Sequence, residues 1–271
     1  MKKINIFCFS VEDFHVLNKL PKNIIPFGLG DKNFPNNWLN EKNNENILKF
    51  NKHFGEATGM YWIWKNKLKE YSKNDWIGFC QYRRLWLDEF LKNKQKFSTA
   101  KLFSKLLKND NQIFDNSESI LLQPILFKSD SLRTQFEKNY GSKILKDCLD
   151  FLEPGEKHDF KNYLEGNSLS ICNMFITNPI IFDKYCNSMF DWIFKCYAYC
   201  LEKNLLKGKN MRLPIFLVER YTSFWFHKHT QVNYLSFARL GNFYLSNFVN
   251  KFINPLNVPF TFGMYPTIHK F

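Results

Sequence analysis

Two short apolar segments flank an amphipathic one in the first third of the chain. The segments KINIFCFSV (residues 3–11) and DWIGFCQY (residues 75–82) have the length and the β-branched or aromatic content of buried strands. Between them, in residues 55–71, apolar side chains recur at helical spacing. A strand, a helix and a second strand in this order are typical of a βαβ unit, so we expect an α/β fold.

The rest of the chain continues this alternation without internal repeats or a flexible linker. We therefore predict one α/β domain, residues 1–271, in which helices flank a mixed sheet and the C-terminal part is helical or irregular. Further strands are predicted at residues 119–127 and 168–177, and helices at residues 88–108, within 131–164, after Pro179 and at 213–229.

The composition is that of a globular protein. Apolar residues make up 45% of the chain, which is enough for a large core and excludes disorder. The net charge of +13 indicates either a solvated coat of lysines or attraction to anionic lipid headgroups or a polyanionic ligand. Arginines are few and the aromatic residues follow buried patterns, which argues against binding of nucleic acid by charge and stacking.

The cysteines and the N-terminus indicate the cellular compartment in which the protein is expected. Seven cysteines occur without a C-x-x-C pair or a histidine at ligand spacing, which predicts reduced, buried thiols and no zinc site. Glu12 and Asp13 interrupt the apolar start of the chain, unlike a signal peptide, and no window approaches the length of a membrane span. We expect a cytoplasmic protein, soluble or peripheral.

Arg83 and Arg84 stand side by side at the end of the predicted strand 75–82, in a chain with only six arginines. The carboxyl end of a parallel strand is where α/β sheets bind ligands, and guanidinium groups suit a phosphate or diphosphate. The alternative is that one arginine pairs with a carboxylate while the other lies on the surface.

Three other polar residues are candidates for a site. Glu219, on the predicted helix 213–229, would serve as a general base if it faced a cleft, or would simply pair with Arg220 or lie on the surface. Glu56 lies near a helix N-terminus, where the helix dipole stabilises its charge. Asn173 lies inside an apolar strand pattern, so its amide either ties a neighbouring loop or touches a ligand.

Several familiar motifs are absent: the chain has no P-loop, no G-x-G-x-x-G, no G-x-S-x-G and no D-x-D. Four blocks nevertheless resemble one bacterial group, the capsule and lipopolysaccharide glycosyltransferases long catalogued as a domain of unknown function. In chain order these blocks are GEATGMYWIWKN, DWIGFCQYRRLW, ICNMFITNPIIFDKYCNSMFDWIF and RLPIFLVERYTSFW. They extend over about residues 28–228, and the specificity comes from their order and spacing together.

The resemblance implies a GT-A-like, Rossmann-type fold that binds a nucleotide sugar. Residues 1–127 would form the nucleotide-sugar-binding half and residues 128–236 the acceptor and catalytic half. Residues 237–271 would be a tail that packs on the core or on a membrane. The residues that match the family's motifs are Glu56, Tyr61, Trp62, Trp64, Lys65 and Asn66 in the first block, Tyr82, Arg83 and Arg84 in the second, Asn173 and Met174 in the third, and Glu219 and Arg220 in the fourth.

The resemblance also implies roles. Gln-Tyr-Arg-Arg occupies the place where a GT-A fold commonly carries the metal-binding D-x-D, so Tyr82, Arg83 and Arg84 are expected to bind the donor diphosphate without a metal cofactor. The alternative is Mn or Mg held by residues such as Asp75 or Asp88. Glu219 is expected to be the base of an inverting transfer, whereas a retaining transfer would not need one. Gln81 departs from the family's usual histidine.

The implied partners are a nucleotide-sugar donor, with UDP as the expected nucleotide and galactofuranose or another hexose as the sugar, and a glycan or lipid-linked glycan acceptor. The acceptor would place the protein in the cytoplasm, with peripheral contact to the inner face of the cytoplasmic membrane. Two alternatives stay open: a catalytically inactive relative that serves as a scaffold in polysaccharide assembly, and a basic nucleic-acid-binding protein.

Overall fold

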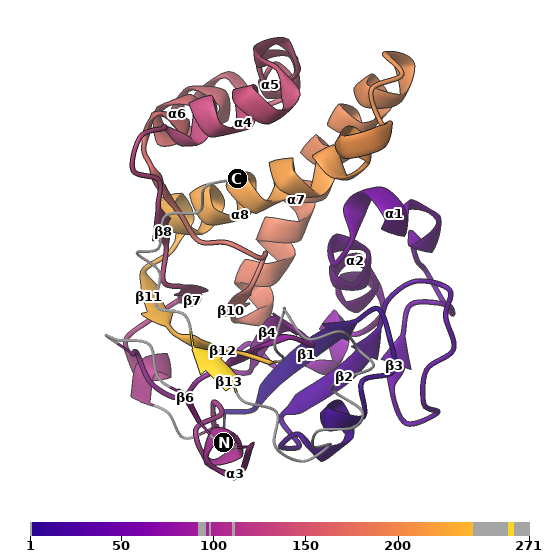
Figure 1. The fold of residues 1–271 in the computed structure, drawn as a ribbon, viewed down its shortest axis with the longest axis vertical. Coiled ribbons are helices and arrows are strands. Elements are labelled where there is room, and N and C mark those ends of the chain that lie inside the picture. Colours follow the sequence, from indigo (N-terminus) through magenta and orange to yellow (C-terminus); the bar gives the residue numbers. More distant parts are fainter. Residues whose placement is uncertain (1, 92–95, 98, 110–111, 241–259, 263–271) are drawn as a thin grey trace.

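A mixed β-sheet forms the centre of the protein (Figure 1). The computed structural model describes residues 2–91, 96–97, 99–109, 112–240 and 260–262. Helices flank the sheet, so the predicted mixed α/β architecture is confirmed. The strands of this sheet are β1 (Ile4–Ser10), β2 (Ile24–Gly28), β3 (Leu39–Asn40), β4 (Trp76–Gln81), β5 (Arg84–Trp86), β6 (Lys96–Phe97), β7 (Ser119–Leu122), β10 (Phe175–Thr177), β11 (Val232–Leu235), β12 (Phe237–Arg239) and β13 (Phe260–Phe262).

The predicted βαβ unit forms the middle of the sheet. Strand β1 lies between β2 and β4 and is parallel to both. Its side chains alternate between two hydrophobic cores, with Phe7 and Phe9 in one and Ile6 and Cys8 in the other. Because a parallel central strand is covered on both faces, its sequence is apolar without alternation. On the other side of β4 lies β10, which is antiparallel to both β4 and the next strand, β7. The sheet ends there with β11, which is parallel to β7.

Long helices cover the sheet face on which Phe7 and Phe9 lie. The ring of Phe79 in β4 is 5.1 Å from that of Phe182, and the ring of Phe175 in β10 is 4.6 Å from that of Phe226. Figure 1 shows the three helices α4 to α6 beyond α7 and α8, on the side away from the sheet. The helices are α1 (Asn51–Phe54), α2 (Ala57–Asn66), α3 (Thr99–Ser104), α4 (Leu132–Tyr140), α5 (Ser142–Leu149), α6 (Pro154–Glu165), α7 (Pro179–Glu202) and α8 (Leu213–His229).

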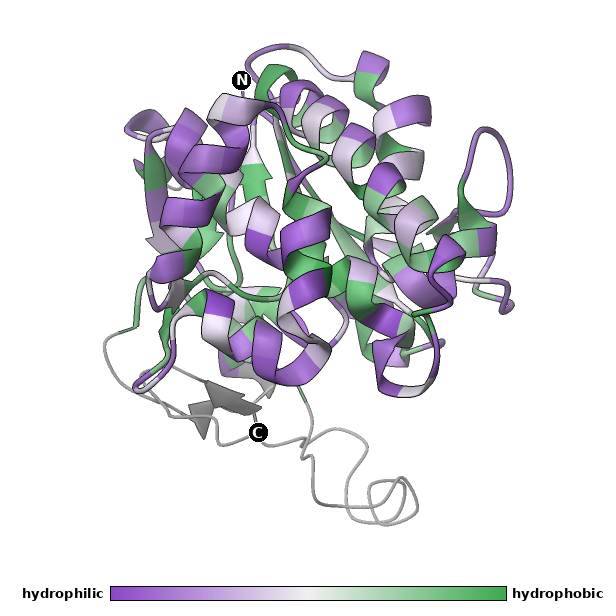
Figure 2. Ribbon diagram, turned by 90° about the horizontal axis from the view of Figure 1, so that it is seen from above, coloured by the Kyte–Doolittle hydropathy of each residue, from purple (hydrophilic) through white to green (hydrophobic). Residues whose placement is uncertain are grey.

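The hydropathy of the residues follows this layering. In Figure 2 the hydrophobic residues are concentrated along the strands inside the molecule, and hydrophilic residues line the outward sides of the helices. All seven cysteines are buried and free, as predicted. In the part of the chain that the structure describes, no helix is both long and apolar enough to cross a membrane.

Two predictions of secondary structure are wrong. Residues 88–91 are not helical: the chain bends at residues 88 and 89, and the N–H of Leu91 donates to Ser236 Oγ. Only α3 is helical in the described part of residues 88–108, while residues 92–95 and 98 lie outside it. Residues 168–177 form two short strands, β9 (Ser168–Leu169) and β10, because the chain turns between them; β9 pairs with β8 (Ile125–Leu126).

The predicted C-terminal tail lies mostly outside the described residues, namely at 241–259 and 263–271. Its first residues form β12, which pairs with β5, and β13 joins β12 to β6. The described part of the tail is therefore built into the sheet next to the strand that begins at Arg84.

Candidate functional site

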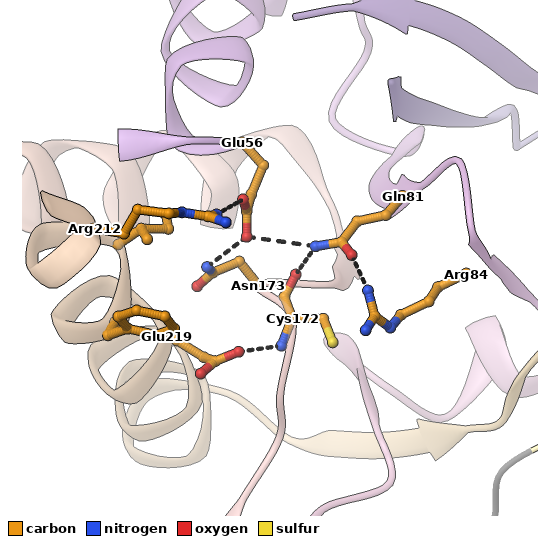
Figure 3. A pocket seen from close by; sticks show the side chains of 9 residues that line it. Glu56, Gln81, Arg84, Cys172, Asn173, Arg212 and Glu219 are labelled. Atoms are coloured by element: carbon orange, nitrogen blue, oxygen red, sulfur yellow. Dashed lines mark hydrogen bonds and ion pairs between the residues drawn. The ribbon is translucent and has the colours of Figure 1, made fainter. Parts of the chain in front are cut away.

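A cavity of about 220 Å³, partly open to solvent, lies at the carboxyl end of β4. Four residues singled out in the sequence line it: Glu56, Arg84, Asn173 and Glu219. They come from four separate elements, and Figure 3 shows how their side chains converge. The complete lining is Glu56, Gln81, Arg84, Cys172, Asn173, Arg212, Ile215, Phe216 and Glu219.

The Gln-Tyr-Arg-Arg sequence is a tight hairpin. Gln81 ends β4, Arg84 begins β5, and the two residues pair across the antiparallel ladder. Tyr82 and Arg83 form the two-residue turn between them, and the N–H of Tyr82 donates to Phe9 O of the neighbouring strand. The reversal brings Arg84 back beside Gln81, where its guanidinium donates to Gln81 Oε1.

Arg83 has a different environment. Its guanidinium pairs with Glu12 at 3.2 Å, and both side chains are more than 40% exposed. The same guanidinium stacks over the ring of Tyr82, which contacts Phe14 edge-on. Tyr82 and Arg83 therefore do not line the cavity. Adjacent arginines separate in this way because the first lies in the turn and the second in a strand.

Glu56 stands directly before α2, where the chain bends sharply at Gly55. Gly55 has a φ of +50°, and a Cβ there would lie 3.1 Å from Arg212, so both the conformation and the space favour glycine. The Glu56 carboxylate does not cap its own helix. It accepts a hydrogen bond from Asn173 Nδ2 at 2.9 Å, and its other oxygen lies 3.8 Å from Arg212.

The turn before β10 contributes Cys172 and Asn173. Both have positive φ, +73° and +50°, which is unfavourable for residues other than glycine and is common at functional sites. Asn173 is almost completely buried, and besides donating to Glu56 it accepts from Thr222 Oγ1 at 3.1 Å. The amide ties the residue before α2 to α8, and Asn173 also lines the cavity, so contact with a ligand stays a prediction.

Glu219 projects from α8 toward the same turn. Its Oε1 accepts the N–H of Cys172 at 2.6 Å. Burial raises the pKa of Glu219, while this hydrogen bond and the positive charges of Arg220 and Arg84 partly oppose the rise. A carboxyl group with a raised pKa that faces a cavity has the properties required of a general base.

The remaining predicted site residues lie away from the cavity. Trp64 stacks on Phe190 and donates from Nε1 to Asp183 of α7, while the ammonium of Lys65 sits 3.6 Å above the Trp64 ring. These contacts bind α2 to α7.

Arg220, next to Glu219 on α8, is buried and does not line the cavity. It donates to Phe216 O and Gln135 and lies over the ring of Phe136. These contacts link α8 to α4. Arg220 acts on Glu219 only through its positive charge, which lowers the pKa of that carboxyl group.

Sequence reasoning missed Gln81 as a contact residue and Arg212 altogether. Arg212 is the last residue of the short 3-10 helix η5 (Gly208–Arg212), and it faces Glu56 across the cavity. The scarcity of arginine, which drew attention to Arg84, applies equally to Arg212. Ile215 and Phe216 were hidden in the apolar pattern of α8 and supply the nonpolar wall.

The side chains fit a divalent metal ion poorly. Within the described residues, no group of three or more His, Cys, Asp and Glu side chains is arranged to hold one. Asp75 stands at the other end of β4, where its carboxylate accepts the N–H groups of Lys3 and Ser72. The Asp88 carboxylate accepts the N–H of Lys108. Neither lines the cavity, which instead holds two guanidinium groups.

The fold resembles that of a solved structure. The chain is similar to the solved apo structure of WbbM, a bifunctional glycosyltransferase, with a TM-score of 0.61 and 17% identity. The similarity covers 86% of this chain and 45% of that one, so the chain spans less than half of WbbM. The similarity shows the fold: a mixed α/β architecture that resembles that of a glycosyltransferase.

The family follows from the sequence match. The chain belongs to the family described as a domain of unknown function (DUF4422), which matches residues 12–230. No curated protein matches the sequence. The matched residues include all nine that line the cavity.

Proposed function

We propose that the protein is a glycosyltransferase that moves a sugar from a nucleotide-sugar donor to a growing capsular or lipopolysaccharide glycan. The observation that carries the proposal is the convergence of Arg84, Arg212 and Glu219 on one cavity at the carboxyl end of β4. Sugar transfer needs positive charge for the departing diphosphate and a carboxylate for the acceptor hydroxyl, and these groups supply both.

Arg84 and Arg212 would bind the donor diphosphate. Among the described residues, the only side-chain hydrogen bond of Arg84 goes to the neutral amide of Gln81, so most of its donors remain available for phosphate oxygens. Arg212 is more than half exposed, and its contact with Glu56 is long. Two fixed positive charges can stabilise the leaving diphosphate as a divalent cation would, so we propose metal-independent transfer.

Glu219 would be the base that takes the proton of the acceptor hydroxyl as the hydroxyl oxygen attacks the anomeric carbon. The bond from the anomeric carbon to the diphosphate then breaks, and the configuration is inverted. The hydrogen bond from Cys172 holds one oxygen of the carboxylate, and the other has no hydrogen bond from the described residues. Tests of stereochemistry would separate this route from a retaining one.

The size of the cavity limits what it holds. At about 220 Å³ it is smaller than the usual range for a drug-sized ligand, about 300–1,000 Å³. We propose that it takes the sugar and the diphosphate, with the nucleoside, expected to be uridine, on the adjoining surface of residues 1–127. The acceptor would approach from residues 128–236, which contribute Glu219 and Asn173.

The proposal includes peripheral contact with the inner face of the cytoplasmic membrane, where a lipid-linked acceptor would lie. Lys207, Lys209 and Met211 are exposed on the segment that leads into Arg212, and Arg212 lines the cavity. Exposed cationic and apolar side chains together suit an anionic lipid surface. This segment would therefore hold the cavity close to the lipid.

The test is calorimetric titration with UDP, GDP and CMP. Arg84→Ala is compared with Arg83→Ala, a matched control that removes the neighbouring guanidinium outside the cavity. We expect UDP binding in the presence of EDTA, a loss of at least tenfold in Arg84→Ala and little change in Arg83→Ala. Binding that requires manganese and is the same in both variants would refute the arginine-based donor site. Failure of all three nucleotides to bind would favour an inactive scaffold protein.

A further inference from the structure

We propose that Gln81 is a positioning residue, which keeps Arg84 apart from Glu56 so that the guanidinium stays available to the donor. This inference rests on the proposed donor site and assigns a role to a residue that does not itself need to touch the sugar. Figure 3 shows the Gln81 amide between the Glu56 carboxylate and the Arg84 guanidinium.

Three contacts hold the amide. Gln81 Nε2 donates to Cys172 O at 3.1 Å and lies 3.5 Å from Glu56 Oε1. Gln81 Oε1 accepts from Arg84 Nη1. The bond to Cys172 is the firmer of the two nitrogen contacts, because 3.5 Å is at the outer limit for a hydrogen bond. It anchors the amide to the strained turn that also binds Glu219.

The chemistry of these partners allows one orientation of the amide. A guanidinium can only donate, whereas a carboxylate and a carbonyl can only accept. A flipped amide would place its NH₂ group against Arg84 and its oxygen against both Glu56 and Cys172 O. Gln81 therefore presents its oxygen to the cation and its nitrogen to the acceptors, and it separates the two charges with a neutral dipole.

Without the Gln81 side chain, Glu56 and Arg84 are expected to form an ion pair. Glu56 and Arg84 line the same partly enclosed cavity, and an ion pair there is less screened than one in bulk water. If the space between them opened, Arg84 would turn to Glu56 and form a bidentate pair. That pair would occupy the donors that the diphosphate needs. Gln81 thus acts on the donor through Arg84.

The test is a double-mutant cycle on UDP binding with the wild type, Gln81→Ala, Glu56→Gln and Gln81→Ala/Glu56→Gln. Gln81→Ala is expected to weaken UDP binding about tenfold, because Glu56 captures Arg84. The double variant lacks the Glu56 carboxylate that would capture Arg84, so UDP affinity should return to within about threefold of Glu56→Gln alone. A residue that merely supported the turn would give losses that add, and this result would overturn the inference.

A conservative variant guards against misfolding of Gln81→Ala. A neutral imidazole has one donor and one acceptor, so Gln81→His at pH 8 can serve Cys172 O and Arg84 together and should keep most of the UDP affinity. Loss of affinity in Gln81→His equal to that in Gln81→Ala would count against the role.

A ligand-free measurement separates this inference from the proposed function. The rate at which phenylglyoxal modifies Arg84, followed by mass spectrometry of its peptide, reports whether the guanidinium is engaged by a carboxylate. We expect slower modification in Gln81→Ala than in the wild type, and recovery in Gln81→Ala/Glu56→Gln. If the wild-type protein binds no nucleotide, the donor-site proposal fails. The role of Gln81 is overturned separately, if phenylglyoxal modifies Arg84 at the same rate in all variants.

Discussion

The main-chain N–H of Cys172 donates a 2.6 Å hydrogen bond to the carboxylate of Glu219, although the turn before β10 and helix α8 are far apart in the sequence. The bond holds one carboxylate oxygen, and the burial of the group raises its pKa. Glu219 is consequently a fixed carboxylate that ionises less readily than an exposed one. Its position is set by a backbone group, which no substitution of a neighbouring side chain can remove directly.

Glu219→Gln should abolish most of the activity and leave the fold intact. Loss of a general base lowers the rate of transfer by about 100-fold to 10,000-fold. The amide oxygen can still accept from Cys172, and a buried charge is removed, so the free energy of unfolding at pH 7 should be equal or higher. Initial rates of sugar transfer and urea unfolding measure the two effects. Glu165→Gln, on an exposed residue paired with Arg133, is the control. Retained activity would rule out Glu219 as the base.

The transfer rate should fall on the acid side at a higher pH than an ordinary glutamate would produce. The base must be ionised, and burial raises the pKa of Glu219 above its usual value near 4.5. As the pH drops through this raised pKa, the ionised fraction and kcat/KM fall together. A profile of kcat/KM from about pH 4 to 8 checks the expectation. An acid-side fall centred at or below the usual pKa of glutamate would contradict it.

Glu41 should make the fold less stable as the pH rises. It is fully buried; Oε1 accepts from Gly30 N–H at 2.7 Å, while Oε2 has no partner among the described residues. Burial raises the pKa of Glu41, so the folded state keeps a proton that the unfolded state has released. The resulting stability is complete below the unfolded pKa, about 4.3, and is lost as the pH rises through the folded pKa.

Glu41→Gln tests this dependence, because glutamine does not titrate. Urea midpoints measured from pH 4 to 8 should decline less in Glu41→Gln than in the wild type. Glu165→Gln, with its exposed carboxylate, should retain the wild-type slope. Parallel slopes in wild type and Glu41→Gln would show that Glu41 is not the titrating group.

Cys172 offers a test of the strained turn. At its φ of +73°, any side chain costs about 1–2 kcal/mol, which glycine avoids. Cys172→Gly should therefore be more stable than Cys172→Ala, by about 1 kcal/mol in urea unfolding. Cys8, a buried residue in the middle of β1, is the matched control, because glycine there should be less stable than alanine by about 0.5–1 kcal/mol. If glycine were less stable than alanine at position 172, as expected at position 8, the turn would be unstrained.

Lys207 and Lys209 test the membrane contact. Each basic residue near an anionic surface contributes about 1 kcal/mol, so Lys207→Glu/Lys209→Glu should reduce binding to anionic vesicles by about 30-fold or more. Lys143→Glu/Lys146→Glu, on exposed positions of α5, changes the charge equally and should bind like the wild type. Co-sedimentation with vesicles measures both variants. Equal losses would show that net charge alone drives the binding.

Local patterns were sufficient for much of the fold. Strands β1 and β4 are short apolar runs, and helices α7 and α8 each begin at or next to a proline and present apolar side chains at helical spacing. Each of these elements buries enough apolar surface for its sequence pattern to indicate its structure. The helix predicted at residues 88–108 failed because the apolar residues there pack through long-range pairing, as in the bridge between Leu87 and Leu106.

The residue types of the candidate site were also visible in the sequence, since arginine is scarce in this chain and Glu219 and Asn173 interrupt apolar patterns. Their arrangement came from tertiary structure alone. The two-residue hairpin decided that Arg84 faces the cavity while Arg83 pairs with Glu12, and α8 decided that Glu219 faces the cavity while Arg220 is buried against α4. Neighbours in the chain point in different directions in turns, strands and helices, so side-chain direction depends on contacts with residues that are distant in the sequence.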